Sequence, residues 1–447
     1  MRYDDIALAV PRILLPKADL DLEKWAVIAC DQHTSNPDYW QQVADLAGDA
    51  PSSLQLIYPE VFLHAKDRPR RIESVRASMD HYVAQGLLEG AEPGFVLVER
   101  QTPHTQARHG LIVALDLEQY SYAADATTLI RTTEGTVLER LPPRIEVRRG
   151  APLETPHILV LIDDPERTVI EPLARESLPL AYDTPLMLGG GHVRGWRVTG
   201  QDRIRRVIQA LRDLKAADVS GAGAHPLLYA MGDGNHSFAT AREVWEEIKR
   251  DAGGLEAVQD HPARHALVEL VNLYDDGLSF EPIHRVVFNA DHKALLAAMA
   301  DYYRSQGSRV EIDTVSDRGT WHELCAALDE SDDHHLPWVA GGRDGAGHQG
   351  ILTIHQPARV LEAVSLQEFL TGFGREHGEL QVDYIHGVET TERIGSQAGN
   401  VGLVSQVIGK HALFPTIIAD GPLPRKSFSL GEAEEKRYYL ECRRLTV

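Results

Sequence analysis

Runs of apolar residues alternate along the chain with amphipathic stretches, and this pattern predicts a mixed α/β protein. The run 24–31 is strand-like, and the residues after Asn36, which can cap a helix that begins at Pro37, have helix character. Apolar side chains recur every three or four positions in residues 71–88, which predicts a helix. The runs 95–102 and 109–117 indicate two strands joined by a turn, and therefore a hairpin.

The next hundred residues are richer in turn and breaker residues. Pro142-Pro143 and Gly150 are expected to break regular structure between two apolar strands. Gly189-Gly190-Gly191 predicts the turn of a second hairpin, because glycine readily adopts the positive φ that such turns need. This triple glycine is not a dinucleotide-binding fingerprint, since a strand rather than a helix follows it.

An apolar strand runs into Asp233-Gly234-Asn235-His236-Ser237 and then into an amphipathic helix. Phe238, Ala241, Trp245 and Ile248 recur at helical spacing and are expected to face a core, and Gly253-Gly254 ends the helix. The strand before the loop is almost wholly apolar, which is typical of a buried central strand. The loop therefore lies at the end of a buried strand, where α/β folds bind ligands.

The pattern restarts beyond residue 290, with a helix predicted over 292–306 and a loop-like stretch over 331–350. His334-His335 in that stretch are expected to be solvated. The predicted organisation is a domain of residues 1–290 with an N-terminal α/β extension and a C-terminal α/β domain of residues 291–447.

Composition narrows the classes of partner. The chain carries 45 Lys and Arg against 66 Asp and Glu, a formal charge of −21, which argues against nucleic-acid binding because that needs a cationic face. Three cysteines without a C-x-x-C pair fit a reducing compartment. The N-terminus lacks the cationic start of a signal peptide, and no apolar run is long enough to cross a membrane. We expect a cytoplasmic protein without a membrane partner.

The loop 233–237 brings an acid, an amide, an imidazole and a hydroxyl to a helix N-terminus. Free backbone N–H groups and the helix dipole favour anions there, phosphate above all. The alternative is that Asp233, Asn235 and Ser237 only form a turn and cap the helix, and composition alone supports both readings equally. His236 favours a functional site slightly, because capping does not need an imidazole.

The segment GDGNHSFATA resembles the Asp-Gly-His-His-Arg motif of a widespread prokaryotic family of unknown function. The segments 131–136, 270–287 and 423–444 resemble three further signatures of that family, so the resemblance spans most of the chain. It implies an α+β fold with a ParB/sulfiredoxin-like core. Related proteins with that core include free-serine kinases, so the resemblance also implies a small-molecule phosphotransferase that uses ATP or ADP with Mg²⁺.

Carried over to this sequence, the resemblance assigns catalytic roles to Glu134, Asp233 and His236. Asp233 would help to hold Mg²⁺, His236 would contact the phosphoryl group, and Glu134 would accept the hydroxyl proton, although an ordinary solvated acid explains Glu134 equally well. The residues expected to bind the substrate or its phosphate are Gly234, Asn235, Ser237, Arg144, His284, Arg285, Lys426 and Ser427.

Two positions depart from the motif. Asn235 stands at its first His and Ser237 at its Arg, which removes a bidentate phosphate anchor. Arg144, Arg242, Arg285 or Lys426 could replace that cation. The alternative function is therefore a non-catalytic regulator that binds a nucleotide or another phosphate-bearing small molecule. A DNA-binding, partition-type role follows only from the fold analogy and is disfavoured by the charge.

Three weaker candidates remain. Residues 31–33, Asp-Gln-His, could line the same cleft, although a simple turn is favoured. His386 with Glu389 could contact a metal or substrate, although this spacing is common on exposed helices. The 21 histidines form no HExxH pattern, so a dedicated zinc site is not expected.

Overall fold

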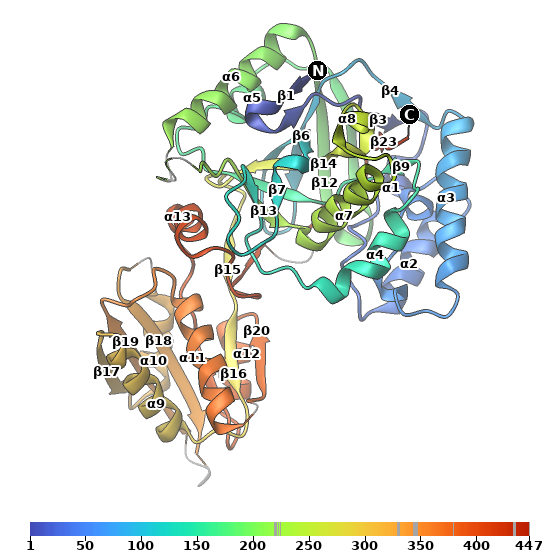
Figure 1. Ribbon diagram of the computed structural model, residues 1–447. Helices are drawn as coiled ribbons and strands as arrows, with labels where there is room; N and C mark the ends of the chain where they lie inside the picture. Colours follow the sequence, from blue (N-terminus) through green and yellow to red (C-terminus); the bar gives the residue numbers. More distant parts are fainter. Residues whose placement is uncertain are drawn as a thin grey trace. The chain divides into compact units, whose positions relative to one another are not determined.

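A computed structural model describes residues 1–218, 221, 223, 225–328, 331–342, 347–378, 380–431 and 435–446. The chain divides into two compact units (Figure 1). Unit 1 contains Met1–Leu278 and Gly431–Val447, and unit 2 contains Ser279–Leu430. The sequence pattern placed one boundary after residue 290. The structure differs because residues 280–287 pair with strands of unit 2, whereas Arg443–Arg444 pair with Leu153–Glu154 of unit 1.

Unit 1 is built around a mixed sheet. Its strands are, in spatial order, β11 (Leu180–Leu186), β12 (Gly191–Val198), β5 (Phe95–Gln101), β6 (Arg108–Asp116), β14 (His265–Asn272), β10 (Leu159–Ile162), β13 (Tyr229–Asp233), β8 (Ile130–Arg131) and β7 (Tyr120–Ser121). β2 (Leu8–Ala9) adds to β6, and β1 (Arg2–Tyr3) pairs with β2. Two small ladders join β3 (Leu14–Pro16) to β4 (Leu88–Gly90) and β9 (Leu153–Glu154) to β23 (Arg443–Arg444).

The central strands of this sheet are buried on both faces. Along β5 and β6, Leu97 and Leu111 belong to one hydrophobic core, whereas Val98 and Ile112 belong to the core on the other side. Successive side chains of a strand point to opposite faces, so a strand between two cores needs an unbroken apolar run. This explains why these segments are apolar throughout rather than alternating.

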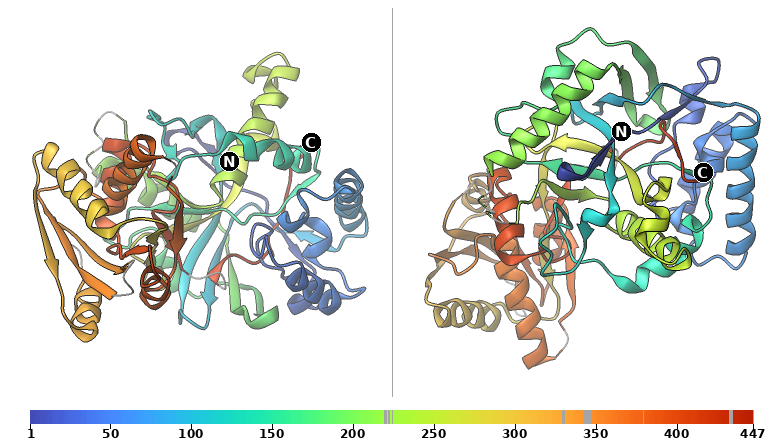
Figure 2. Two further views of the ribbon diagram at one scale, coloured as in Figure 1. Left: turned by 90° about the horizontal axis from the view of Figure 1, so that it is seen from below. Right: turned by 45° about the horizontal axis from the view of Figure 1, so that its top comes forward.

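Helices cover both faces of the sheet. The helices of unit 1 are α1 (Leu22–Trp25), α2 (Pro37–Ala47), α3 (Arg68–Ala84), α4 (Leu141–Arg148), α5 (Glu171–Ala174), α6 (Gln201–Ala217), α7 (Asn235–Asp251) and α8 (Leu255–Val258). α6 and α7 contribute to one core, while α1–α3 contribute to the other together with residues 438–442. In both views of Figure 2 the blue helices α1–α3 stay grouped at one side of unit 1.

Unit 2 is a separate antiparallel sheet with helices on both faces. Its strands are, in spatial order, β17 (Arg309–Thr314), β19 (Gly347–His355), β18 (His334–Gly341), β21 (Val401–Leu403), β16 (His284–Val287) and β20 (Val382–Ile385). β15 (Phe280–Pro282) pairs with β22 (Phe428–Leu430). α9 (His292–Ser305) and α11 (Glu362–His377) pack on one core. α10 (Arg318–Ala326) and α12 (Val388–Gly395) contribute to another, and α13 (Lys410–Asp420) follows β21.

Most predicted elements are present. The mixed α+β class, the helix over 71–88, the two hairpins and the helix over 292–306 are confirmed as α3, β5–β6, β11–β12 and α9. The ParB/sulfiredoxin-like core stays an expectation. No described helix is long and apolar enough to cross a bilayer.

Three expectations are wrong. Residues 24–31, expected as a strand, contain the end of α1 (Leu22–Trp25) and a single isolated bridge between Ile28 and Tyr438. Residues 334–341, expected in a loop, form β18, and His334 is only 1% exposed. The cause is that Leu336, Trp338 and Ala340 bury one face of that strand. Residues 343–346 of the expected loop lie outside the described chain.

Pro142 and Pro143 do not break regular structure. They occupy the first turn of α4. A backbone N–H in the first turn has no acceptor within the helix, so proline, which lacks this N–H, costs no hydrogen bond there.

Candidate functional site

The junction between β13 and α7 has the geometry that the sequence predicts. β13 ends at Asp233 and α7 begins at Asn235, so Gly234 alone turns the chain, with φ +77°. A Cβ at Gly234 would lie 3.1 Å from Cα of Ile158, so the position requires glycine for both conformation and space. No side chain caps the N-terminus of α7, a described helix of 17 residues. Its first turn therefore presents the positive end of a long helix.

The loop that carries Glu134 lies against this helix start. β8 and β13 are parallel neighbours, so the loops that follow them emerge at the same edge of the sheet. The Thr132 hydroxyl lies 2.7 Å from Oδ1 of Asn235 and 2.6 Å from the carbonyl oxygen of Glu134. The Thr133 hydroxyl donates to the carbonyl oxygen of Met231 at 2.5 Å. The structure thus brings the segment of Glu134 to the segment of Asp233.

The same loop contacts the ring of His236. The N–H of Val137 donates to Nε2 of His236 at 3.3 Å. A backbone N–H can only donate, so Nε2 is the acceptor in this contact. The hydroxyl of Thr240, one turn further along α7, donates to the carbonyl oxygen of His236 at 2.7 Å.

Lys436 supplies a cation that the sequence analysis missed. Its Nζ lies 3.1 Å from Oδ2 of Asp233, whose Oδ1 accepts the N–H of Gly234 at 2.8 Å. Burial acts to raise the pKa of Asp233, but Lys436, the Gly234 N–H and His157 together hold it below its ordinary value. Lys436 follows Asp233 by 203 positions in the sequence (436 − 233), so no local pattern links the two residues. Lys436 lies in the segment 423–444, and only the resemblance of that segment to a family signature could have drawn attention to it.

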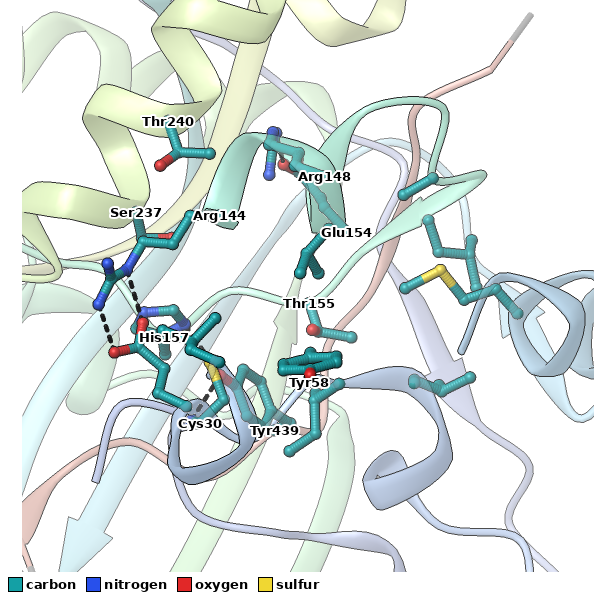
Figure 3. Close-up of a pocket in the computed structure, with 18 residues that line it drawn as sticks. Cys30, Tyr58, Arg144, Arg148, Glu154, Thr155, His157, Ser237, Thr240 and Tyr439 are labelled. Carbon is teal, nitrogen blue, oxygen red and sulfur yellow. Dashed lines mark hydrogen bonds and ion pairs between the residues drawn. The ribbon is translucent and has the colours of Figure 1, made fainter. Parts of the chain in front are cut away.

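A small pocket opens beside the first turns of α7 (Figure 3). Its volume is about 120 Å³, and Ser237 and Thr240 form its α7 wall. α4 contributes Arg144, Val147 and Arg148 to the lining. The apolar part of the lining consists of Leu56, Ile57, Leu63, Met79, Val147, Ala151 and Leu153.

The charged groups of this pocket are paired. Arg144 donates to Glu60 through Nε at 2.6 Å and through a second nitrogen, so the pair is bidentate. Burial raises the pKa of Glu60 in spite of Arg144. Arg148 pairs with Glu154; burial acts to raise the pKa of Glu154, but Arg443 and Arg148 outweigh it and lower that pKa.

The floor of the pocket contains a chain of polar side chains from three distant segments. The N–H of Cys30 donates to the hydroxyl oxygen of Tyr439 at 3.0 Å, and that oxygen lies 2.9 Å from Nδ1 of His157. Nε2 of His157 lies 3.9 Å from the carboxylate of Asp31. Residues 31–33 form the turn that the sequence favours, and Asp31 also approaches the pocket. Burial raises the pKa of the Cys30 thiol well above its ordinary value, so the thiol stays protonated.

The other predicted site residues divide between the two units. Arg144 lines the pocket, whereas Arg242 pairs with Glu118 and Glu246 and donates to the carbonyl oxygen of Leu117. His284, Arg285, Lys426 and Ser427 belong to unit 2.

Within unit 2 two of these residues, Arg285 and Lys426, lie over the ring of Tyr384. The Arg285 guanidinium lies 4.9 Å from the centre of the Tyr384 ring, and Nζ of Lys426 lies 5.1 Å from the same point. Nδ1 of His284 accepts the N–H of Ser405 at 3.1 Å. Burial, with Arg285, lowers the pKa of His284 to about 4. The Ser427 hydroxyl donates to the carbonyl oxygen of Pro424 at 2.6 Å. Phosphate binding by these four residues stays a prediction.

Comparison with known proteins identifies the family. The profile of a family described as "Protein of unknown function (DUF1015)" matches residues 14–344. No curated protein matches the chain. Among solved structures, a free serine kinase in complex with AMP resembles it with 10% identity and a TM-score of 0.35, over 73% of this chain and 90% of that one.

Two further structures show comparable likeness. A conserved hypothetical protein from Pyrococcus furiosus has 10% identity and a TM-score of 0.32, over 75% of this chain and 95% of that one. SbnI with C-terminal truncation from Staphylococcus aureus has 9% identity and a TM-score of 0.33, over 72% and 82%. Likeness at this level carries no information on what the present chain binds.

Proposed function

We propose that this chain, which belongs to the DUF1015 family, is a small-molecule phosphotransferase that moves a phosphoryl group from ATP or ADP to a hydroxyl group. One observation carries the proposal. The loops after the parallel strands β8 and β13 bring Glu134, Asp233 and His236 to an uncapped helix N-terminus, with the ammonium group of Lys436 beside them. An acid, an imidazole, a cation and a helix dipole are the groups that phosphoryl transfer uses.

In the proposed complex the donor phosphates bind at the first turn of α7. The backbone around Gly234 lies close to Ile158, so the turn leaves no room for a side chain at this position. Lys436 takes the place of the arginine that the motif would have at Ser237, and Nδ1–H of His236 donates to a phosphate oxygen.

Magnesium would enter with the nucleotide. The described residues contain no group of three or more His, Cys, Asp or Glu side chains that could hold a metal, and both oxygens of Asp233 already have partners. Mg²⁺ is commonly held by one or two carboxylates together with substrate phosphates. Asp233 fits the role of such a single carboxylate once Lys436 moves from it to the phosphate oxygens.

The transfer step assigns Glu134 as the proton acceptor. The acceptor hydroxyl oxygen forms a bond to the terminal phosphorus, and its proton passes to the Glu134 carboxylate. The bond between that phosphorus and the bridging oxygen breaks, and the nucleotide leaves one phosphate shorter. The Thr132 hydroxyl, 2.6 Å from the carbonyl oxygen of Glu134, fixes the backbone that presents this side chain.

The test combines binding with turnover. The purified full-length protein is incubated with Mg²⁺, ATP or ADP and a panel of small hydroxyl compounds, and phosphorylated products are identified by mass spectrometry. We expect at least one product, and its loss in Glu134→Gln and Asp233→Asn. The proposal fails if no compound is phosphorylated and Asp233→Asn binds nucleotide as tightly as the wild type does.

The non-catalytic alternative keeps the same binding site. It is favoured by Asn235 and Ser237, which stand where the family motif has His and Arg, and by the hydrogen bond that Asn235 accepts from Thr132. A regulator of this kind would gain thermal stability from ADP or ATP without turnover, because a ligand that binds only the folded state stabilises it.

A further inference from the structure

We propose that the pocket between α4 and α7 binds the phosphoryl acceptor, and that this acceptor is a small uncharged hydroxyl compound with a hydrocarbon body. That the bound compound accepts a phosphoryl group rests on the proposed function. The preference of the pocket for such a compound can be tested without that function. Ser237 connects the two sites, because it belongs to the first turn of α7 and also lines the pocket (Figure 3).

The volume of the pocket decides which reactant it receives. An apolar cavity of about 150 Å³ holds one benzene molecule, and this pocket has about 120 Å³. A nucleoside, with about three times as many non-hydrogen atoms as benzene, is too large for it. The pocket therefore suits a compound of roughly six non-hydrogen atoms, and the nucleotide is assigned to the helix start outside it.

The charges of the pocket decide the polarity of that compound. Both arginines of the lining are engaged by glutamates, Arg144 by Glu60 and Arg148 by Glu154. A ligand carboxylate would compete with Glu60 or Glu154 for these cations, and a ligand ammonium would compete with the arginines. Burial, the largest cause, raises the pKa of Glu60 in spite of Arg144, so a charged group loses hydration in this pocket. A free amino acid would thus lose hydration without gaining a counterion.

The polar groups that remain suit an uncharged hydroxyl compound. Ser237 and Thr155 line the pocket with hydroxyl groups, and His157 adds an imidazole ring. Tyr439 contacts Nδ1 of His157, and Nε2, on the other side of the ring, lies 3.9 Å from the Asp31 carboxylate. Leu56, Ile57 and Met79 offer an apolar surface to the rest of the molecule. Short diols and similar alcohols combine these two properties.

The experiment measures binding and transfer separately. Saturation-transfer NMR on the full-length protein compares butanediol and propylene glycol with L-serine and L-homoserine, in the absence of nucleotide. Val147→Phe fills the pocket from α4, and Leu138→Phe, at a residue that is 56% exposed and outside the lining, is the matched control. Nucleotide binding is followed by the shift in Tm with ATP and Mg²⁺, and transfer by mass spectrometry.

We expect the diols to bind at least tenfold more tightly than the amino acids, and Val147→Phe to abolish this binding. Leu138→Phe should keep it, and the Tm shift with nucleotide should be unchanged in both variants. Tighter binding of an amino acid, or diol binding that survives Val147→Phe, overturns the inference and leaves the transferase proposal standing. Diol binding without any phosphorylated product supports the pocket assignment and counts against the transferase.

Discussion

The two regions that carry the family-like motifs differ in how far their polar groups are buried. At the α7 site, which comprises residues 132–137, 233–237 and Lys436, the side chains of Asp233 and Lys436 are 31% and 16% exposed. In the Tyr384 cluster of unit 2, His284 is 2% exposed, Arg285 is fully buried and Ser427 is 1% exposed. The groups named at the α7 site are partly exposed, whereas in unit 2 only Lys426 is exposed and His284, Arg285 and Ser427 are buried.

A charged residue of a motif can therefore serve folding as well as chemistry. A fully buried guanidinium over an aromatic ring, close to Glu362, stabilises the packing of unit 2 only while its partners stay in place. A half-buried carboxylate with an exchangeable ammonium partner can instead respond to a ligand. Four substitutions test this distinction, in decreasing order of expected effect.

The largest effect should come from Arg285→Met in the Tyr384 cluster. Arg285 and Glu362 are both buried, and the charge of Arg285 lowers the pKa of Glu362. Leaving a buried charge uncompensated costs about 3–5 kcal/mol. Urea unfolding followed by hydrogen exchange over residues 279–430 measures this loss. Nucleotide affinity should change less than twofold. A large loss of affinity with unchanged stability would show that Arg285 binds phosphate after all.

Asp233→Asn should act in the opposite way. It removes the anion beside Lys436 at a partly exposed position, so stability should change little, whereas turnover should fall about 100-fold, as expected for loss of an electrostatic group at the reacting centre. Steady-state kinetics with the best acceptor checks the prediction. Asp213→Asn, at an exposed acid on α6, is the matched control. Equal kinetics for the two variants would remove Asp233 from the mechanism.

The third prediction concerns acid stability. Burial lowers the pKa of His284 to about 4 from the ordinary 6.5, so the unfolded chain binds this proton first as the pH falls. The contribution of His284 is complete above about pH 6.5 and is lost towards pH 4, by up to about 3 kcal/mol. His284→Asn can still accept from Ser405 but cannot titrate, so unit 2 should lose less stability between pH 7 and pH 5.

A second buried group, Glu362, also titrates in this pH range, so the His284→Asn variant must be compared directly with the wild type. Burial raises the pKa of Glu362 to about 7 from 4.5, so its contribution is complete below pH 4.5 and is lost as the pH rises through 7. This trend opposes that of His284, and only the difference between wild type and His284→Asn isolates the histidine. Parallel unfolding curves for the two proteins between pH 7 and pH 5 would contradict the assignment.

The smallest effect is expected from Thr132→Val. The substitution removes the hydrogen bond to Asn235 that ties the Glu134 loop to the helix start, worth about 1 kcal/mol. Amide exchange at Val137 should accelerate about fivefold. Thr128→Val, which removes a hydroxyl bonded within its own segment, is the control. Unchanged exchange in Thr132→Val would mean that the loop is held by other contacts.

Much of the fold could be predicted because its signals are local. The apolar runs of β5 and β6, the spacing in α3 and the glycines at 189–191 each determine structure within a few residues. β18 was missed because polar residues and Pro337 mask its alternation, and its burial depends on pairing with β19 and β21. The first turn of α4 was missed because two prolines indicate a break unless the helix begins at that point.

The candidate site was predicted only in part. Asp233, Gly234 and His236 stand in one short loop, and a glycine between a buried strand and an amphipathic helix is visible in the sequence. The association of Glu134 with that loop rested on resemblance, and the structure supplies its physical cause in the parallel pairing of β8 with β13. Glu60, His157 and Tyr439 carried no signal of their own, since each is an ordinary residue until the fold brings it to the pocket.

The position of the candidate helix start follows from the sequence alone, because the strand, the glycine and the helix follow one another without a gap. The charges around it depend on the tertiary structure. Residues 431–446 return to unit 1 after the whole of unit 2, and this return places Lys436 on Asp233 and Tyr439 beneath His157. Electrostatic and packing interactions depend on distance in space, whereas sequence patterns report only neighbours along the chain.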